Sequence, residues 1–412
     1  MAHSPGPRAV KHAETGARDG PADARLGPGL ILFLAVTVMM TAGSIHFQTP
    51  LLPEFGRVFD ADAATVGWVP TLSFAGFLSG TLFLVPLGDR YDKRRIILAK
   101  FACLTVSVLI IAAAPTLAVL AAASFATGVA ASVSQDVLAL AAELVEPGER
   151  GRAIGTALSG LFIGILLARV GSGFLASLVG WRWTYVLYGA LLAALLPVLF
   201  TRLPRATSRT QLAYRALMQS LVGMLRARVD LRRASATQFL LGICYGGFWA
   251  TMAQMMETLH GLGPAYAGLI GIPGAAGVLI ARSAGRWMDR SGVRPVVSAG
   301  AGLVITAFVV FGFSGLTIIA VIAGAALLDC GLRAAMVANQ AYIIGLDPAA
   351  RSRSNTVFAV HVWGGNATGA FVASTAWTHF GWLGVCACGV VAATCALAVQ
   401  RLAGGSAAPA PE

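Results

Sequence analysis

Charged residues are scarce in this chain of 412 residues. Asp, Glu, Lys and Arg make up only 12% of it, whereas hydrophobic residues make up 57%. A soluble domain carries about 25% charged residues, so this chain cannot cover a water-facing surface. Its apolar residues fall in runs of about 20, the length that a helix needs to cross about 30 Å of hydrocarbon. The composition therefore predicts an integral membrane protein, with the lipid bilayer as its main solvent.

Lysine is the rarest of the charged residues, with only Lys11, Lys93 and Lys100. None of them follows a glycine, so the chain lacks the Walker A motif that holds ATP phosphates. The formal net charge of +12 comes from short links between apolar runs rather than from one face of a domain. This distribution argues against nucleic-acid binding. An ion gradient or a partner subunit would have to supply any energy that the protein uses.

Disulfide, metal and catalytic motifs are also missing. The six cysteines all lie inside apolar runs, with no disulfide or zinc pattern: Cys103, Cys244, Cys330, Cys386, Cys388 and Cys395. The zinc-protease motif H-E-x-x-H does not occur. We expect no metal and no cofactor, and we do not predict an enzyme. An intramembrane enzyme and a non-transporting sensor are the weaker alternatives.

Twelve apolar runs can be counted between polar breaks. They are continuous rather than alternating, which excludes strands, and backbone groups in lipid must bond within their own segment, so we expect helices. The predicted spans are 29–50, 63–86, 96–114, 116–141, 152–178, 183–201, 234–257, 265–286, 294–313, 316–341, 354–377 and 381–401.

Lys and Arg are distributed unevenly between the two faces of this predicted bundle. The tails and the even-to-odd links hold 26 of the 30. Basic residues accumulate on the cytoplasmic side, so both termini are predicted to be cytoplasmic. Residues 1–28 are rich in Pro, Gly and charge and are expected to be a disordered tail rather than a signal peptide. A second tail covers 402–412.

The longest link, 202–233, divides the spans six and six, as 29–201 and 234–401. Apolar residues recur in it at helical spacing. This pattern predicts an amphipathic helix on the anionic inner leaflet, with a plain solvated linker as the alternative.

The two groups of six spans share sequence features about 200 residues apart. Asp89 corresponds to Asp289, and Gly180-Trp181 corresponds to Gly381-Trp382. Pro147, Arg150 and Arg152 recur as Pro348, Arg351 and Arg353. The chain is therefore predicted to be two parallel copies of one unit.

Two charged links carry a family resemblance. Asp89-Arg90-Tyr91-Asp92-Lys93-Arg94-Arg95 and the stretch Gly285–Arg294 resemble the signature of the major facilitator superfamily of secondary transporters. The resemblance covers 29–401. It implies an all-α membrane protein with twelve transmembrane helices in two parallel-repeat six-helix halves, working by alternating access as a monomer in the bacterial inner membrane.

The resemblance gives the charged links a role in gating. In the family the signature Asp caps a helix of the other half and the Arg residues pair with carboxylates, and several such contacts bias one state. The matching residues here are Asp89, Arg90, Arg94, Asp289 and Arg290. Setting membrane topology is the alternative role. Because Asp92 stands where the signature has a second Gly, we expect Asp289 to contribute more than Asp89.

The form of the first link is also similar to that of bacterial multidrug and small-metabolite exporters. Proton-coupled efflux of a small organic compound is therefore the predicted function, with an uptake symporter or facilitator for a metabolite as the alternative. Two exporter features are altered: Ser124, not Arg, precedes Gly128, and Arg169 lies where the fifth helix often carries a Pro-containing motif. Both departures weaken the prediction of drug/proton antiport.

Polar residues inside the spans are candidates for the proton and substrate site, because a charge in lipid is costly. Asp329 is the first candidate, for the proton or a cationic substrate, with Arg333 one turn away; mutual neutralisation is the alternative. Asp136, beside Gln135, could pair with Arg333 across the cavity or simply lie at a helix end. Arg169 could meet an anionic substrate group or line the outer vestibule, with hydrogen bonds to backbone carbonyls of a neighbouring helix as the alternative.

Six further polar residues could face the cavity, although a packing hydrogen bond is the commoner role for such residues. They are His46, Gln48, His361, Asn366, Asn339 and Gln340.

Overall fold

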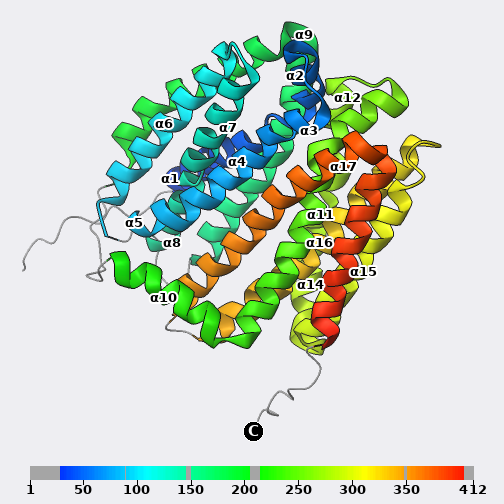
Figure 1. Cartoon of the computed structure of the whole chain (residues 1–412). Helices are drawn as coiled ribbons and strands as arrows, with labels where there is room; N and C mark the ends of the chain where they lie inside the picture. The colour runs from blue at the N-terminus through cyan, green and yellow to red at the C-terminus, as the bar shows by residue number, and fades with distance from the viewer. Residues whose placement is uncertain (1–27, 89, 145–149, 205–213, 348–349, 403–412) are drawn as a thin grey trace, which may run out of the picture.

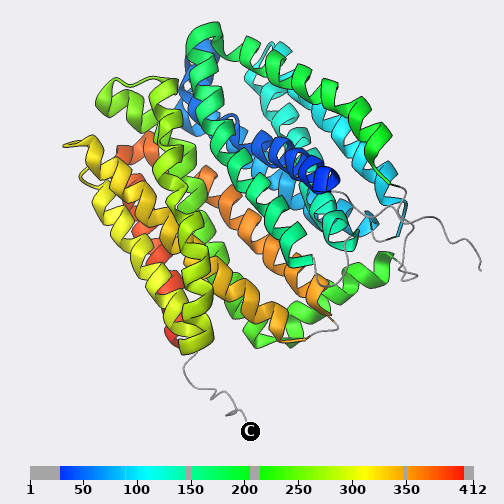
Figure 2. The same ribbon diagram turned by 180° about the vertical axis from the view of Figure 1, so that it is seen from behind.

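The computed structural model describes residues 28–88, 90–144, 150–204, 214–347 and 350–402. Within these ranges the chain is almost entirely helical and contains no strand. Helices from the first half of the sequence pack together on one side of the molecule, and those from the second half pack on the other (Figures 1 and 2). We call these sets the N-terminal group and the C-terminal group.

Nine helical stretches among the described residues are long and apolar enough to cross a membrane. Two of them, Ile154–Arg202 and Arg353–Arg401, are 49 residues long, about twice the length of one crossing. Each contains one residue with non-helical dihedral angles, Gly180 in the first and Gly381 in the second. The predicted all-helical architecture is thus confirmed for the residues that the structure describes.

The N-terminal group runs from α1 to α9. Its elements are α1 (Pro28–Gly43), η1 (Ser44–His46), η2 (Thr49–Leu51), α2 (Leu52–Phe59), α3 (Ala63–Val66), α4 (Trp68–Ser79), the π-helical turn η3 (Gly80–Leu84), α5 (Val85–Gly88), α6 (Lys93–Ala113), α7 (Leu117–Ala131), α8 (Val133–Glu143) and α9 (Arg150–Arg202).

The C-terminal group runs from α11 to α17, and α10 connects the two groups. The elements are α10 (Tyr214–Ala227), α11 (Val229–His260), α12 (Pro264–Leu269), α13 (Gly271–Gly274), α14 (Ala276–Ser291), α15 (Val293–Phe311), α16 (Ile318–Gly345) and α17 (Arg351–Leu402).

Several predicted spans are divided in the structure. The run predicted at 265–286 consists of α12, α13 and α14, and it is not among the nine long apolar helices. The runs predicted at 63–86 and 116–141 are also interrupted, by η3 and at Ser132 respectively. Hydropathy locates an apolar segment but does not show where the backbone hydrogen-bond pattern of its helix changes.

Two hydrophobic cores correspond to the two groups. The larger cluster is built almost entirely from residues between Leu34 and Leu203, and the second lies between Leu241 and Ala396. Trp181 and Trp382, the tryptophans of the repeated Gly-Trp pairs, are both buried, one in each core. The glycines before them both have positive φ, +78° at Gly180 and +61° at Gly381, which only glycine adopts without strain.

The connecting helix α10 lies under one end of both groups (Figures 1 and 2). Leu221 is buried in a third cluster with Val357 and Phe358 of α17, and the hydroxyl of Tyr214 donates to the carbonyl of Phe83 in η3 at 3.1 Å. A helix is therefore present within the linker 202–233, and Leu221 on its apolar side packs on protein. We call this end of the molecule the α10 end and the opposite one the α12 end.

Candidate functional site

A cavity of about 200 Å³ lies between the two groups of helices. Its walls come from both: His46, Gln135 and Phe162 on one side and Gln238, Tyr245 and Arg333 on the other. Most of the remaining surface is apolar, from Leu138, Leu158, Leu161, Ile165, Leu332, Met336, Phe358, Val362 and Trp363. Polar groups on an apolar wall are typical of small-molecule sites.

Asp329 and Arg333 lie one turn apart on α16 at the edge of this cavity. Arg333 Nε is 3.8 Å from Asp329 Oδ1, an ion-pair distance but too long for a hydrogen bond. Arg333 lines the cavity, and its guanidinium carbon is 4.9 Å from the ring centre of Phe162 on α9. Asp329 lies behind it, with its side chain 3% exposed and Oδ2 without a hydrogen-bond partner among the described residues.

Arg169 is the second buried guanidinium, and it connects the two groups. It belongs to α9, yet its Nη2 donates to the hydroxyl of Tyr245 at 2.7 Å and lies 3.3 Å from His46 Nδ1. Its guanidinium carbon lies only 3.4 Å from the ring centre of Trp249. Tyr245 and Trp249 are on α11, so Arg169 reaches across the interface. It does not line the cavity between the two groups.

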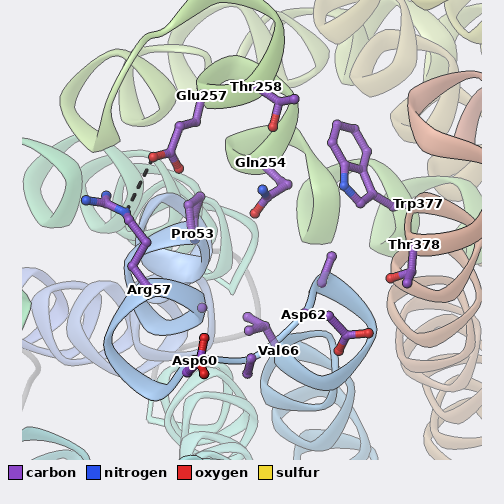
Figure 3. A pocket seen from close by; sticks show the side chains of 13 residues that line it. Pro53, Arg57, Asp60, Asp62, Val66, Gln254, Glu257, Thr258, Trp377 and Thr378 are labelled. Carbon is purple, nitrogen blue, oxygen red and sulfur yellow. Dashed lines mark ion pairs between the residues drawn. The ribbon is translucent and has the colours of Figure 1, made fainter.

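The groups also meet at the α12 end, on the far side of Arg169 from the cavity. Arg57 Nε on α2 is 3.4 Å from Glu257 Oε1 on α11, and the amide of Ala64 donates to Thr378 Oγ1 at 3.1 Å. Figure 3 shows the Arg57–Glu257 pair at the rim of an open pocket of about 750 Å³ between these elements. Glu257 was not among the residues predicted for the site.

Asp136 pairs within the N-terminal group rather than across the cavity. Its Oδ2 accepts from Lys100 Nζ of α6 at 2.6 Å, and both side chains are less than 10% exposed. The predicted partner, Arg333, lies instead beside Asp329 and Phe162. The Asp136–Arg333 pair predicted for the cytoplasmic gate is not formed in this structure.

Five of the predicted polar candidates line the cavity: His46, Gln135, Arg333, Gln340 and Asn366. Gln340 Nε2 donates to Asn355 Oδ1, another lining residue, at 2.8 Å.

Three other candidates do not line it. Gln48 is buried and donates to the carbonyl of Ile45 at 3.4 Å, and His361 Nδ1 lies 2.8 Å from the carbonyl of Val357 on its own helix. Asn339 lies at a smaller cavity near the α10 end. In this structure the side chains of these three residues do not line the cavity between the two groups.

The charged links make few contacts between the groups. Arg94 donates to the carbonyl of Phe200 and stacks on its ring, both within the N-terminal group, so the predicted carboxylate partner is absent among the described residues. Arg90, Asp289 and Arg290 are exposed. Asp89 lies outside the described residues.

Asp92, the departure from the family signature, has a structural role of its own. It is the N-cap of α6, where Oδ1 accepts from the amide of Arg94 at 3.0 Å. At the matching position Gly292 has a φ of +80°, whereas Asp92 has a φ of −57°. The two links therefore enter their following helices by different backbone routes.

Tyr245, Trp249 and Lys100 were not predicted as site or ion-pair residues. The two aromatics look like ordinary apolar residues in a sequence, and Lys100 was counted at a helix end. One signal was present: Lys93 and Lys100 are seven apart, and so are Asp136 and Glu143. The structure pairs them as Lys93–Glu143 at 2.5 Å and Lys100–Asp136 at 2.6 Å.

Comparison with known proteins agrees with this architecture. The chain is 32% identical over 369 residues to the "Uncharacterized transporter YgaY" of Escherichia coli, covering 89% of this chain and 94% of that protein. It is 30% identical over 381 residues to "Probable transporter SCO4007" of Streptomyces coelicolor, covering 92% and 88%.

Among solved structures, a bacterial homolog of the human lysosomal transporter Spinster, in an inward-facing and occupied conformation, has the same fold. Its TM-score is 0.73 at 15% identity, covering 92% of this chain and 98% of that one. The model of the Major Facilitator Superfamily matches residues 32–284, more than half of the chain. The protein belongs to the Major Facilitator Superfamily and is an integral membrane transporter.

Proposed function

We propose that the protein is a proton-coupled secondary transporter that moves a small organic compound by alternating access in the bacterial inner membrane. One observation carries this proposal: the carboxylate of Asp329 is buried beside Arg333, and Arg333 lines a cavity between the two groups. A charge at this depth in a bilayer costs at least about 2.5–3.5 kcal/mol and is retained where it has a function. Asp329 is the proposed proton-binding group.

The proposed topology is twelve spans in two six-helix halves, 29–201 and 234–401, with a linker at 202–233 and cytoplasmic tails at 1–28 and 402–412. Support comes from the positive-φ breaks at Gly180 and Gly381, 201 residues apart, which divide α9 and α17 at matching places. The asymmetry of Lys and Arg makes the α10 end cytoplasmic. The working unit is proposed to be a monomer.

The contacts between the groups define the proposed state of the transport cycle. The N-terminal and C-terminal groups touch at the α12 end through Arg57–Glu257 and Ala64–Thr378, and Arg169 joins them next to the cavity. With the α10 end cytoplasmic, this is an inward-facing arrangement. Asp89, Arg90, Arg94, Asp289 and Arg290 would then gate the cytoplasmic side when it closes.

Two directions of transport are candidates. Efflux by proton antiport is favoured by the resemblance of the first charged link to exporters. Uptake by proton symport is favoured by a specific observation: Arg333, not Asp329, faces the cavity. A cationic substrate would approach Asp329 past a guanidinium, which makes the cation-binding role of Asp329 unfavourable.

A flux assay tests the proposed function. The protein is reconstituted in liposomes with a pH-sensitive dye and supplied with a panel of small carboxylates, amides and amines under a pH gradient of either sign. Substrate-dependent proton movement is expected for at least one member, and its sign separates symport from antiport. Substrate flux with no accompanying proton movement would refute proton coupling.

A further inference from the structure

We infer that the substrate is a small amphipathic monoanion whose carboxylate binds Arg333, and that this anion crosses the membrane together with a proton held by Asp329. The inference rests on the proposed function and adds the substrate class and the sign of coupling. It revises the sequence-based hypothesis that Asp329 binds a cation.

The charge of the cavity wall is the first argument. Of its twenty described lining residues, Arg333 is the one that carries a full charge, and none is Asp or Glu. The other polar groups are amides, a phenol and an imidazole. These groups can both donate and accept hydrogen bonds, so they do not select for an anion or a cation. A guanidinium facing a mainly apolar cavity favours an anionic ligand, because a cationic ligand would meet a like charge and no carboxylate on the cavity wall.

The contacts of Arg333 are the second argument. Arg333 makes no hydrogen bond to a described residue, and its carboxylate neighbour is 3.8 Å away. A guanidinium has five N–H donors in a planar fork that suits a carboxylate bidentately. The face of Phe162 holds this fork in place from the other group of helices. The unused donors point to a carboxylate of the substrate as their missing partner.

The size and surface of the cavity limit the rest of the molecule. A volume of about 200 Å³ is below the roughly 300–1,000 Å³ of pockets for drug-sized ligands. Leucines, Phe162, Phe358 and Trp363 supply most of the wall, so the body of the substrate is apolar or aromatic. Amides at Gln135 and Asn366 are available for one hydroxyl or carbonyl group.

The position of Asp329 gives the coupling. Asp329 and the substrate carboxylate compete for the same guanidinium, and two carboxylates cannot both ionise cheaply beside it. A proton on Asp329 frees Arg333, so proton and anion bind together and travel in the same direction. The other charged or titratable groups around Asp329 are Cys330 on α16, Arg169 on α9, Tyr245 on α11 and His46 on η1, the last two in contact with Arg169.

Binding to the purified full-length protein tests the inference. The probes are matched trios that share one carbon skeleton: 3-phenylpropionate, its amide and 3-phenylpropylamine, together with straight-chain and branched trios of similar size. Carboxylates are expected to bind at least about tenfold more tightly than their amides and amines, and more tightly at mildly acidic than at mildly alkaline pH.

The variants separate charge, geometry and protonation. Arg333→Gln alone leaves Asp329 without its cation, so the double variant Arg333→Gln with Asp329→Asn is used, and it should lose carboxylate affinity by about ten- to a hundredfold. Arg333→Lys should recover part of it. Asp329→Asn should bind the carboxylate with an affinity that no longer depends on pH, whereas His46→Gln should keep the pH dependence.

Three results would overturn the inference: an amine or amide that binds as tightly as its carboxylate, no binding by any carboxylate of the panel, or an unchanged pH dependence in Asp329→Asn. Failure of the inference is distinguishable from failure of the proposed function. Proton-linked flux of an amine or a neutral compound refutes only the inference that the substrate is an anion. Substrate flux without proton movement refutes both.

Discussion

At the scale of single residues, two ion pairs tie α6 to α8. Lys93 pairs with Glu143 and Lys100 with Asp136, one pair two helical turns beyond the other. The inner pair is enclosed, with exposures of 7% and 3%, whereas the side chain of Glu143 is 44% exposed. Geometry is similar in both pairs but solvation differs, so their contributions to stability should differ.

Asp136→Asn is therefore expected to cost about 3–5 kcal/mol, because it removes the carboxylate partner of a buried ammonium. Glu143→Gln, the matched control, should cost about 1 kcal/mol or less, since its pair is partly solvated. Thermal unfolding of the purified protein in detergent measures both. A double variant that replaces Lys100 and Asp136 by Met and Leu should recover most of the loss.

Equal destabilisation by Asp136→Asn and Glu143→Gln would show that burial does not set the strength of these pairs.

Residue type alone predicted part of the candidate site. Asp329 and Arg333 stand out in the sequence, because charged residues are rare within membrane-spanning segments. Which polar residues face the cavity depends on helix rotation, so Asn366 lines it and His361, five positions earlier, does not. The aromatic partners of Arg169 gave no signal, since Tyr245 and Trp249 look like core residues until a guanidinium is stacked on them.

At the scale of elements, the positions of the apolar helices were predictable because their length and composition are dictated by the bilayer. The breaks within them were less so. Gly180 and Gly381 were marked by the repeated Gly-Trp pair, but the division of 265–286 into α12, α13 and α14 had no counterpart in the hydropathy pattern. Such breaks depend on tertiary packing.

The connecting helix α10 was predicted from its amphipathic pattern, and part of its apolar face packs on protein in the structure. An amphipathic pattern states that one face is apolar, but it does not say whether lipid or protein covers that face. In the structure Leu221 packs against α17 and is 6% exposed, whereas the neighbouring Val222 is 52% exposed. These two residues on one helix offer a matched comparison.

Leu221→Ala should release α10 from the helices above it, because truncating a buried Leu costs about 2–5 kcal/mol. Hydrogen–deuterium exchange over 214–227 should then be at least about tenfold faster than in the wild type. Val222→Ala should leave the exchange nearly unchanged. If both variants exchanged alike, α10 would be held by something other than this packing.

At the scale of the whole molecule, the two groups meet at the α12 end through close approach of small residues as well as through polar contacts. Gly67, just before α4, lies against Ser374 of α17: a Cβ at Gly67 would be 2.3 Å from the Cβ of Ser374. The Arg57–Glu257 pair is exposed and worth about 0–1 kcal/mol. Steric fit therefore matters more than this ion pair for closure.

Gly67→Val should open the α12 end, because the added side chain cannot share space with Ser374. Spin labels at Val58 and Leu259, both exposed and on opposite groups, report the separation by pulsed electron paramagnetic resonance in a background without the native cysteines. The distance should increase. Gly171→Val is the control, since a Cβ there meets no atom within 4 Å. An unchanged distance in Gly67→Val would mean that Ser374 moves to make room for the added side chain and that the two groups stay in contact.

Proton coupling through Asp329 is the central claim, and transport by Asp329→Asn in proteoliposomes tests it most directly. The variant resembles the protonated carboxyl, so substrate exchange without a gradient should continue at a rate comparable to that of the wild type. Accumulation driven by a pH gradient should be lost, because the group that takes up and releases the proton is gone. Gradient-driven accumulation at the wild-type level in Asp329→Asn would contradict the account.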